Sequence, residues 1–168
     1  MSSVPVLDNP APARKRRVAL ARVEKASDVQ VPRSVHVLMG KLIGVTLKSE
    51  EDVLRLQQRG MPAKAFERLV VHLPVGIEQV VGSRSSLRRR MSEGVLSDTE
   101  SERALRVTRV LAHAIDLFGD EDKAKAWLTR PAPYVSGQPE VSPLELCAHE
   151  SGAKIIENRL LQTRYGIF

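Results

Sequence analysis

The stretch "SDTESERALRVTRVLAHAIDLFG" (97–119) carries the clearest helix signal in this chain of 168 residues. Ser97 is a residue type that caps helices, and Glu100, three positions later, completes the pattern of a capping box. Gly119 is a typical C-terminal stop. The apolar positions between them recur at helical spacing: Leu105, Val107, Val110, Leu111, Ala114, Ile115 and Phe118. The pattern predicts a long amphipathic helix with one buried face.

Helix signals also continue on both sides of this stretch. Cap or stop residues that mark further helices are Ser49, Gly60, Pro62, Asp120, Ser142 and Gly166. They predict helices near 50–58, 62–73, 76–81, 86–91, 121–130 and 151–164, and a further helix that begins at Pro143. Only "VHVLMGKLIGVTL" (35–47) stays open between a short strand and a buried helix, because periodicity does not separate the two. The predicted fold class is all-α.

The positive charge is concentrated near the start of the chain. The net charge is +6, and residues 1–33 hold seven Lys or Arg against three acids. This segment has few large apolar residues, which predicts a disordered basic arm. Its "RKRR" (14–17) followed by "VALARV" resembles an export signal, but the apolar part is short and is interrupted by Arg22 and Glu24. We therefore expect a cytoplasmic protein.

The composition argues against several functional classes. No apolar run approaches the ~18 residues of a membrane span, so no membrane association is expected. The four histidines are far apart, and the single cysteine, Cys147, forms no C-x-x-C pair, so we expect no metal. No nucleophile elbow, phosphate-binding loop or dinucleotide-binding glycine motif is present. The sequence thus predicts a protein that is not an enzyme and needs no cofactor.

The segment "VVGSRSSLRRRM" (80–91) is similar to the turn and second helix of a helix-turn-helix. Its candidate DNA-binding residues are Arg84, Ser85, Arg88, Arg89 and Arg90. Arginines on such a helix suit phosphate contacts and guanine recognition. The turn is irregular, because Val81 stands where glycine is usual when Leu87 is taken as the core residue. A solvated basic helix face is the alternative.

The second half of the chain carries a more specific pattern. Its parts are "LFGDEDKAKAWL", "RPAP", "SPLEL" and "SGAKIIENRLLQTRYGIF". Together these segments resemble the toxin-binding domain of the Xre/MbcA/ParS antitoxins, over about residues 105–168. Residues 48–104 resemble the upstream domain of that family more loosely. The loop "YVSGQPEVS" looks longer than is usual in the family.

The resemblance implies an antitoxin whose partner is a RES-domain toxin of a type II toxin–antitoxin system. Such toxins look like ADP-ribosyltransferases and consume NAD, and the antitoxin closes the route to the NAD site. Many such complexes also repress their own operon through operator DNA. The positions that match the toxin-contacting end of the family are Leu160, Leu161, Arg164, Tyr165, Ile167 and Phe168.

The predicted organisation is an arm (1–33), an Xre-like helix-turn-helix and dimerisation region (34–104), and a toxin-binding domain (105–168). Segment 35–47 is either a homodimer contact or part of the chain's own core. The apolar tail either inserts into a partner or folds back onto its own domain. A helix-turn-helix regulator without a toxin partner is the alternative for the whole protein.

Overall fold

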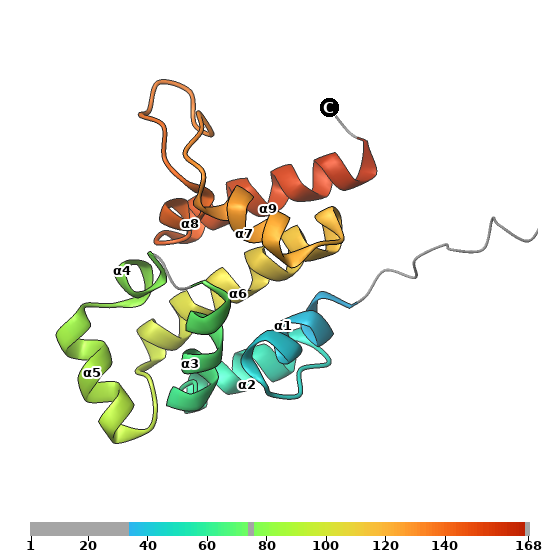
Figure 1. Cartoon of the computed structure of the whole chain (residues 1–168). Coiled ribbons are helices and arrows are strands. Elements are labelled where there is room, and N and C mark those ends of the chain that lie inside the picture. Colours follow the sequence, from blue (N-terminus) through green and yellow to red (C-terminus); the bar gives the residue numbers. More distant parts are fainter. Residues whose placement is uncertain (1–33, 74–75, 167–168) are drawn as a thin grey trace, which may run out of the picture. The chain divides into compact units, whose positions relative to one another are not determined.

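The structure is a computed structural model, and it describes residues 34–73 and 76–166. The predicted arm and the tail residues Ile167 and Phe168 lie outside the described residues. All regular elements in the described part are helices, which confirms the all-α fold class. Figure 1 labels them in chain order: α1 (Val35–Ile43), α2 (Glu50–Arg59), α3 (Ala63–His72), α4 (Ile77–Val81), α5 (Arg84–Glu93), α6 (Asp98–Phe118), α7 (Glu121–Thr129), α8 (Pro143–Leu146) and α9 (Glu150–Tyr165).

Helix α6 is the central element of the fold. Figure 1 shows it between α1–α3 on one side and α7–α9 on the other, and α1, α2, α4, α7 and α9 all pack against it. The predicted capping box is present, because the Ser97 side chain accepts a hydrogen bond from the Glu100 amide while the Glu100 carboxylate accepts one from the Ser97 amide. The completely buried side chains of its core face include Ala104, Val107, Val110, Leu111 and Ala114. Each buried Val or Leu stabilises the fold by about 1.5–3 kcal/mol.

The ambiguous apolar segment 35–47 is helical over α1. Leu38, Met39, Leu42 and Ile43 are buried, and α1 packs against α6 and α3. The helix ends at Gly44, whose left-handed backbone (φ 69°) suits glycine. The apolar side of α1 is therefore occupied by the chain's own core. The homodimer stays a prediction.

The predicted boundary between residues 104 and 105 falls inside α6. That helix continues without interruption from Asp98 to Phe118, and the described residues, 34–73 and 76–166, belong to one compact unit. Helices from the upstream region (α1, α2, α4) and from the downstream region (α7, α9) share α6 as their packing partner. The two predicted regions therefore have one common hydrophobic core.

The junction between α8 and α9 depends on a close backbone approach. A Cβ atom at Gly152 would lie 2.2 Å from the carbonyl oxygen of Leu146, far inside van der Waals contact. Arg106 of α6 donates hydrogen bonds to the carbonyl oxygens of Cys147 (3.1 Å) and Ala148 (3.2 Å) at the same junction. Glycine in the "SGAK" motif is therefore required by packing.

Replacing Gly152 with alanine should separate α8 from α9. Overpacking of this kind costs about 1–3 kcal/mol, so the melting temperature of Gly152→Ala should fall by several degrees. Ser151→Ala is the matched control, because Ser151 is the exposed neighbour of Gly152 in α9. Equal melting temperatures for the two variants would contradict the close approach.

Candidate functional site

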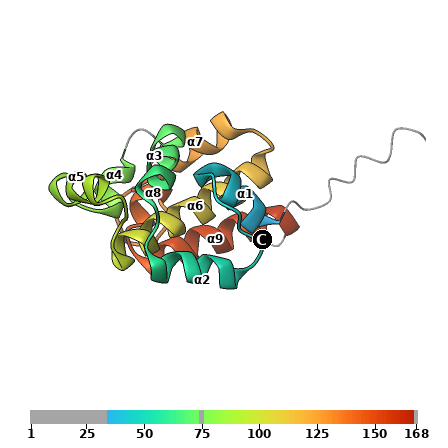
Figure 2. The same cartoon turned by 90° about the horizontal axis from the view of Figure 1, so that it is seen from below.

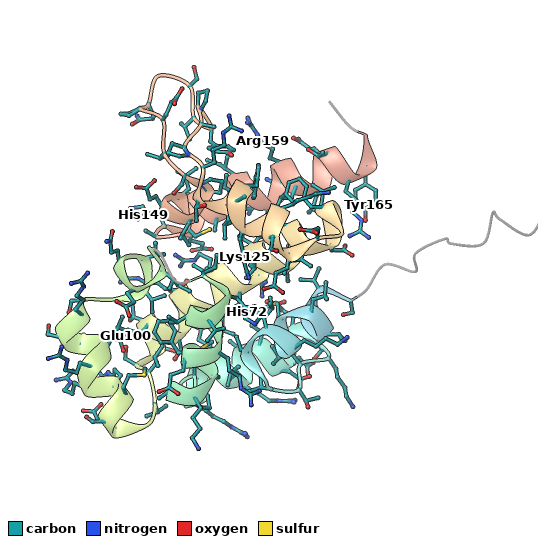
Figure 3. All side chains as sticks on the ribbon, viewed as in Figure 1. His72, Glu100, Lys125, His149, Arg159 and Tyr165 are labelled. Atoms are coloured by element: carbon teal, nitrogen blue, oxygen red, sulfur yellow. The ribbon has the colours of Figure 1, made fainter. Side chains whose placement is uncertain are left out.

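The C-terminal end of α9 contains the residues predicted to contact a toxin. The helix ends as predicted at Gly166, whose left-handed backbone (φ 64°) closes the last turn. Leu160 is 3% exposed and packs in the chain's own core. Tyr165 is 67% exposed and lies at the far end of α9 in Figure 3. Of the predicted toxin-contacting residues, Leu160 therefore lies in the core and Tyr165 lies at the surface.

A stripe of side chains on the solvent side of α9 leads to this end. Lys154, Asn158, Leu161 and Tyr165 are spaced by four, three and four residues, which places them on one helix face. Lys154 and Asn158 are exposed and Leu161 is half-buried. The stripe lies opposite the buried positions of α9, so it is accessible to a partner. In the described tail, Tyr165 projects into solvent and does not fold back.

Arg164 is held within the chain. Its guanidinium forms an ion pair with Asp116 near the end of α6, and the Asp116 side chain is only 9% exposed. The Arg164 guanidinium also lies 5.9 Å from the centre of the Tyr165 ring. The sequence prediction directed Arg164 toward a partner and did not include Asp116. An acid within the apolar run "AIDLF" was the available signal.

His113 of α6 is a largely buried histidine that is influenced by the charge of Arg164. Burial is the main cause that lowers the pKa of His113, and the positive charges of Arg109, Arg164 and His36 lower it further. The ring is therefore neutral near pH 7. Among residues 34–73 and 76–166, no group of three or more His, Cys, Asp or Glu side chains is arranged to hold a metal ion. In the same ranges, no helix combines the length and the apolar character needed to cross a bilayer.

The long loop 131–142 is attached to α7 by an aromatic contact and to α9 by a cation–π contact. The ring centroids of Phe118 and Trp127 are 5.8 Å apart, and those of Trp127 and Tyr134 are 6.2 Å apart. The Arg159 guanidinium lies 5.3 Å from the centre of the Tyr134 ring, which is cation–π geometry. A bridge between Ala132 and Val141 closes the loop. The rest of the loop extends away from the helices in Figure 1.

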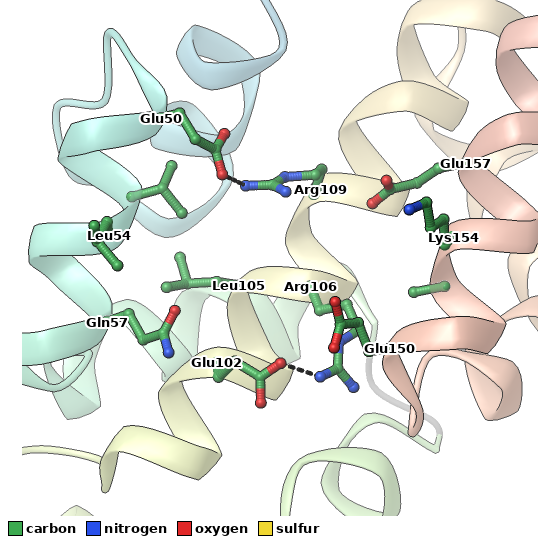
Figure 4. Close-up of a pocket in the computed structure, with 12 residues that line it drawn as sticks. Glu50, Leu54, Gln57, Glu102, Leu105, Arg106, Arg109, Glu150, Lys154 and Glu157 are labelled. Carbon is green, nitrogen blue, oxygen red and sulfur yellow. Dashed lines mark hydrogen bonds and ion pairs between the residues drawn. The ribbon is translucent and has the colours of Figure 1, made fainter.

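A charged groove of about 320 Å³ lies between α2, α6 and α9, and Figure 4 shows its lining. Glu50 pairs with Arg109 and with His36 (3.0 Å), and Glu102 pairs with Arg106. Burial raises the pKa of Glu157 on the α9 side. Many of these charges neutralise one another. We therefore interpret the groove as a polar contact region between α2, α6 and α9.

The candidate DNA-binding helix is α5, which follows α4 after only Gly82 and Ser83. Ser83 caps it by accepting a hydrogen bond from the Ser86 amide (3.2 Å). Gly82 has an extended backbone (φ −174°), so the turn lacks the left-handed glycine of a regular helix-turn-helix. Leu87 is buried, as predicted for a core position, and Val81 is fully buried.

The predicted DNA-binding residues fall into two groups. Arg84, Ser85, Arg88 and Arg89 are exposed on α5. Arg90 instead points into the fold, where its Nε donates to Glu100 (3.1 Å) and its Nη1 donates to Glu93 (2.6 Å). We therefore assign Arg90 to the attachment of α5, while the four exposed residues remain available to a ligand.

Glu100 is the residue that attaches α5 to α6, and the sequence indicated only its capping role. It is 6% exposed and accepts hydrogen bonds from the Ser86 hydroxyl, the Arg90 guanidinium and the Ser97 amide and hydroxyl. Burial opposes its ionisation, but the hydrogen bonds from Ser86 and Ser97 and the charge of Arg90 outweigh burial. They lower the pKa of Glu100 from 4.5 to about 2.

Glu100→Gln should destabilise the chain at neutral pH by about 1–3 kcal/mol, because charge-assisted hydrogen bonds are lost. The folded-state pKa lies below the ordinary 4.5, so the ionised carboxylate stabilises the fold above pH 4.5. That contribution is lost as the pH falls toward 2. Urea unfolding at neutral pH and at about pH 3 should thus show a smaller difference between wild type and variant in acid.

Glu93→Gln is the control for this experiment. Glu93 also pairs with Arg90, but its side chain is 42% exposed, so its removal should change the free energy of unfolding little. A difference between wild type and Glu100→Gln that stays constant over the whole pH range would contradict the assigned role of the carboxylate.

Comparison with known families finds a match for the second half of α6 and the helices that follow it. Residues 113–166 match the family model described as the antitoxin Xre/MbcA/ParS C-terminal toxin-binding domain. The match extends from the second half of α6 to Gly166. The C-terminal part of this chain is therefore similar to the toxin-binding domain of the Xre/MbcA/ParS antitoxins.

Individual relatives agree with this assignment. Antitoxin Xre from Photorhabdus laumondii is 40% identical over 85 residues, which cover 50% of this chain and 55% of that protein. Antitoxin Xre from Yersinia enterocolitica is 37% identical over 52% of this chain and 58% of its own length. Antitoxin Xre from Pseudomonas putida is 32% identical over 61% of this chain and 62% of its own length. The chain spans a little more than half the length of the curated relatives it matches.

Proposed function

We propose that this chain is an antitoxin, not an enzyme, that binds a RES-domain toxin of a type II system through the C-terminal end of α9. The single observation that carries the proposal is the match of residues 113–166 to a toxin-binding domain. The exposure of Tyr165 next to the left-handed stop at Gly166 supports it, because both features belong to a surface that is available to a partner. In this proposal the tail covers the route to the toxin's NAD site.

The amount of apolar surface at the tail is sufficient for an important contribution to affinity. Burial of one Ile and one Phe side chain contributes about 1.5–3 kcal/mol each. A pair of such contacts changes a dissociation constant by orders of magnitude. Tyr165 adds an exposed aromatic ring, a residue type that is frequent in energetically dominant contacts.

Deletion of residues 165–168 should abolish neutralisation without unfolding the chain. The last strongly buried residue of α9 is Leu160, so the truncated protein should keep its helical circular dichroism and a melting temperature within a few degrees of wild type. Co-expression of the truncated chain with a cognate RES-domain toxin should no longer restore growth or preserve cellular NAD.

Three results would contradict this proposal. A truncated chain that still neutralises the toxin at equal expression would show that the tail is dispensable. A truncated chain whose melting temperature is far below that of wild type would show that the tail stabilises its own domain, and any loss of function would then follow from unfolding. Turnover of NAD by the purified chain alone would argue against a binding protein altogether.

A second function, operator binding that represses the chain's own operon, is favoured by the exposed basic face of α5. Arg84, Arg88 and Arg89 are accessible on one short helix, and phosphate contacts by such residues give salt-dependent DNA affinity. A cytoplasmic homodimer that reads two half-sites is the form we propose for this activity. If no RES-domain reading frame lies beside the gene, the alternative of a regulator without a toxin partner is favoured.

Arg88→Ala/Arg89→Ala should weaken binding to the promoter DNA of the chain's operon. Each lost phosphate contact should reduce the slope of log affinity against log salt by about 0.9. Arg55→Ala/Arg59→Ala is the matched control, because it removes two exposed arginines from α2 instead. Equal promoter affinity for wild type and both double variants, measured by fluorescence anisotropy, would exclude α5 as the contact.

A further inference from the structure

We propose that Asp116 is a positioning residue for the end of α9: it holds Arg164, and thereby fixes the last turn of the helix, which carries Tyr165 and leads to Gly166. This inference rests on the proposed function of the tail. It assigns Arg164 to a role inside the chain, where the sequence had suggested a direct contact with the toxin, and it adds a residue of α6 to the determinants of neutralisation.

Arg164 attaches the last turn of α9 to α6. Leu160 is the last buried residue of the helix, and helix ends fray when tertiary contacts do not hold them. Leu161 is half-buried, whereas Gln162, Thr163 and Tyr165 are exposed. The ion pair between Arg164 and Asp116 is therefore the attachment that continues beyond Leu160 in the described residues.

Arg164 also compensates negative charge at the C-terminal ends of α6 and α9. The C-terminal ends of α6 and α9 lie side by side in Figures 1 and 2, so the negative ends of two helix dipoles are close together. Asp116 adds a carboxylate that is only 9% exposed. Arg164 supplies the positive charge in the last turn of α9, and its guanidinium compensates all three negative contributions.

The contact between Arg164 and Asp116 also sets the direction of the last residues of α9. The same guanidinium lies against the Tyr165 ring, 5.9 Å from its centre, and Gly166 follows with a fixed left-handed backbone. A last turn that is held in place presents these residues in one direction. A tail that is ordered before binding loses less conformational entropy in the complex, and this raises affinity without new contacts.

A double-mutant cycle separates positioning from direct contact. The variants are Asp116→Asn, Arg164→Gln and the double variant, all in the full chain. The first measurement is amide hydrogen exchange of residues 161–166, which needs no toxin. The second is the affinity for the cognate toxin by isothermal titration. Asp122→Asn is the matched control, because it removes the same charge from a carboxylate that is 96% exposed.

We expect each single variant to lose exchange protection in residues 161–166 and to bind the toxin about tenfold more weakly, a change of about 1.4 kcal/mol. The double variant should be no weaker than the weaker single variant, because both changes remove one interaction. Arg164→Lys should recover part of the protection and part of the affinity, since it keeps the charge. Asp122→Asn should resemble wild type in both measurements.

Two results would overturn the inference. If Arg164→Gln weakens toxin binding by the same factor in the Asp116→Asn background, Arg164 contacts the toxin directly. If Asp116→Asn leaves the exchange of residues 161–166 unchanged, Asp116 does not hold the turn. Failure of the proposed function has a different signature: wild type would not bind the toxin, while the exchange measurements alone would still decide the role of Asp116.

Discussion

The burial of α6 is the constraint on which the rest of this structure depends. One helix with core residues such as Val107 and Leu111 supplies the surface on which five other helices pack. Its N-terminal end is fixed by a capping box, and Gly119 ends it. Because upstream and downstream helices all pack on α6, the basic helix α5 and the end of α9 belong to one compact unit.

Two carboxylates with little exposure, near the two ends of α6, hold neighbouring helices against it. Glu100 holds α5 through Arg90 and Ser86, and Asp116 holds the end of α9 through Arg164. The two carboxylates are sixteen residues apart along the helix, a rise of about 24 Å at 1.5 Å per residue. The two candidate binding surfaces are thus attached to opposite ends of the same rigid element, and each attachment uses an arginine that the sequence had assigned to a partner.

The sequence predicted the features that are local. Caps and stops such as Ser49, Ser97 and Gly166 depend on a few neighbouring residues, and the structure confirms them. The segment 35–47 stayed ambiguous, because short apolar runs fit a strand and a buried helix equally well. Its helical state follows from packing against α6, which no local pattern encodes.

The candidate site was predictable in outline only. Exposed positions such as Tyr165 and Arg88 follow from the helical pattern and from the family resemblance. The internal roles of Arg90 and Arg164 depend on acids 10 and 48 residues away, and a charge pair at such separations leaves no periodic signal. Leu160 matched the family's contacting end, but its neighbours in space make it a core residue.

We propose that the end of α9 enters the toxin at its NAD site, and photo-crosslinking from position 165 is a direct test of this contact. Benzoylphenylalanine in place of Tyr165 would be irradiated in the complex with the cognate toxin, and the crosslinked peptides would be sequenced. We expect crosslinks to toxin residues that line the NAD pocket. Crosslinks to this chain's own helices, or to a toxin surface remote from that pocket, would contradict it.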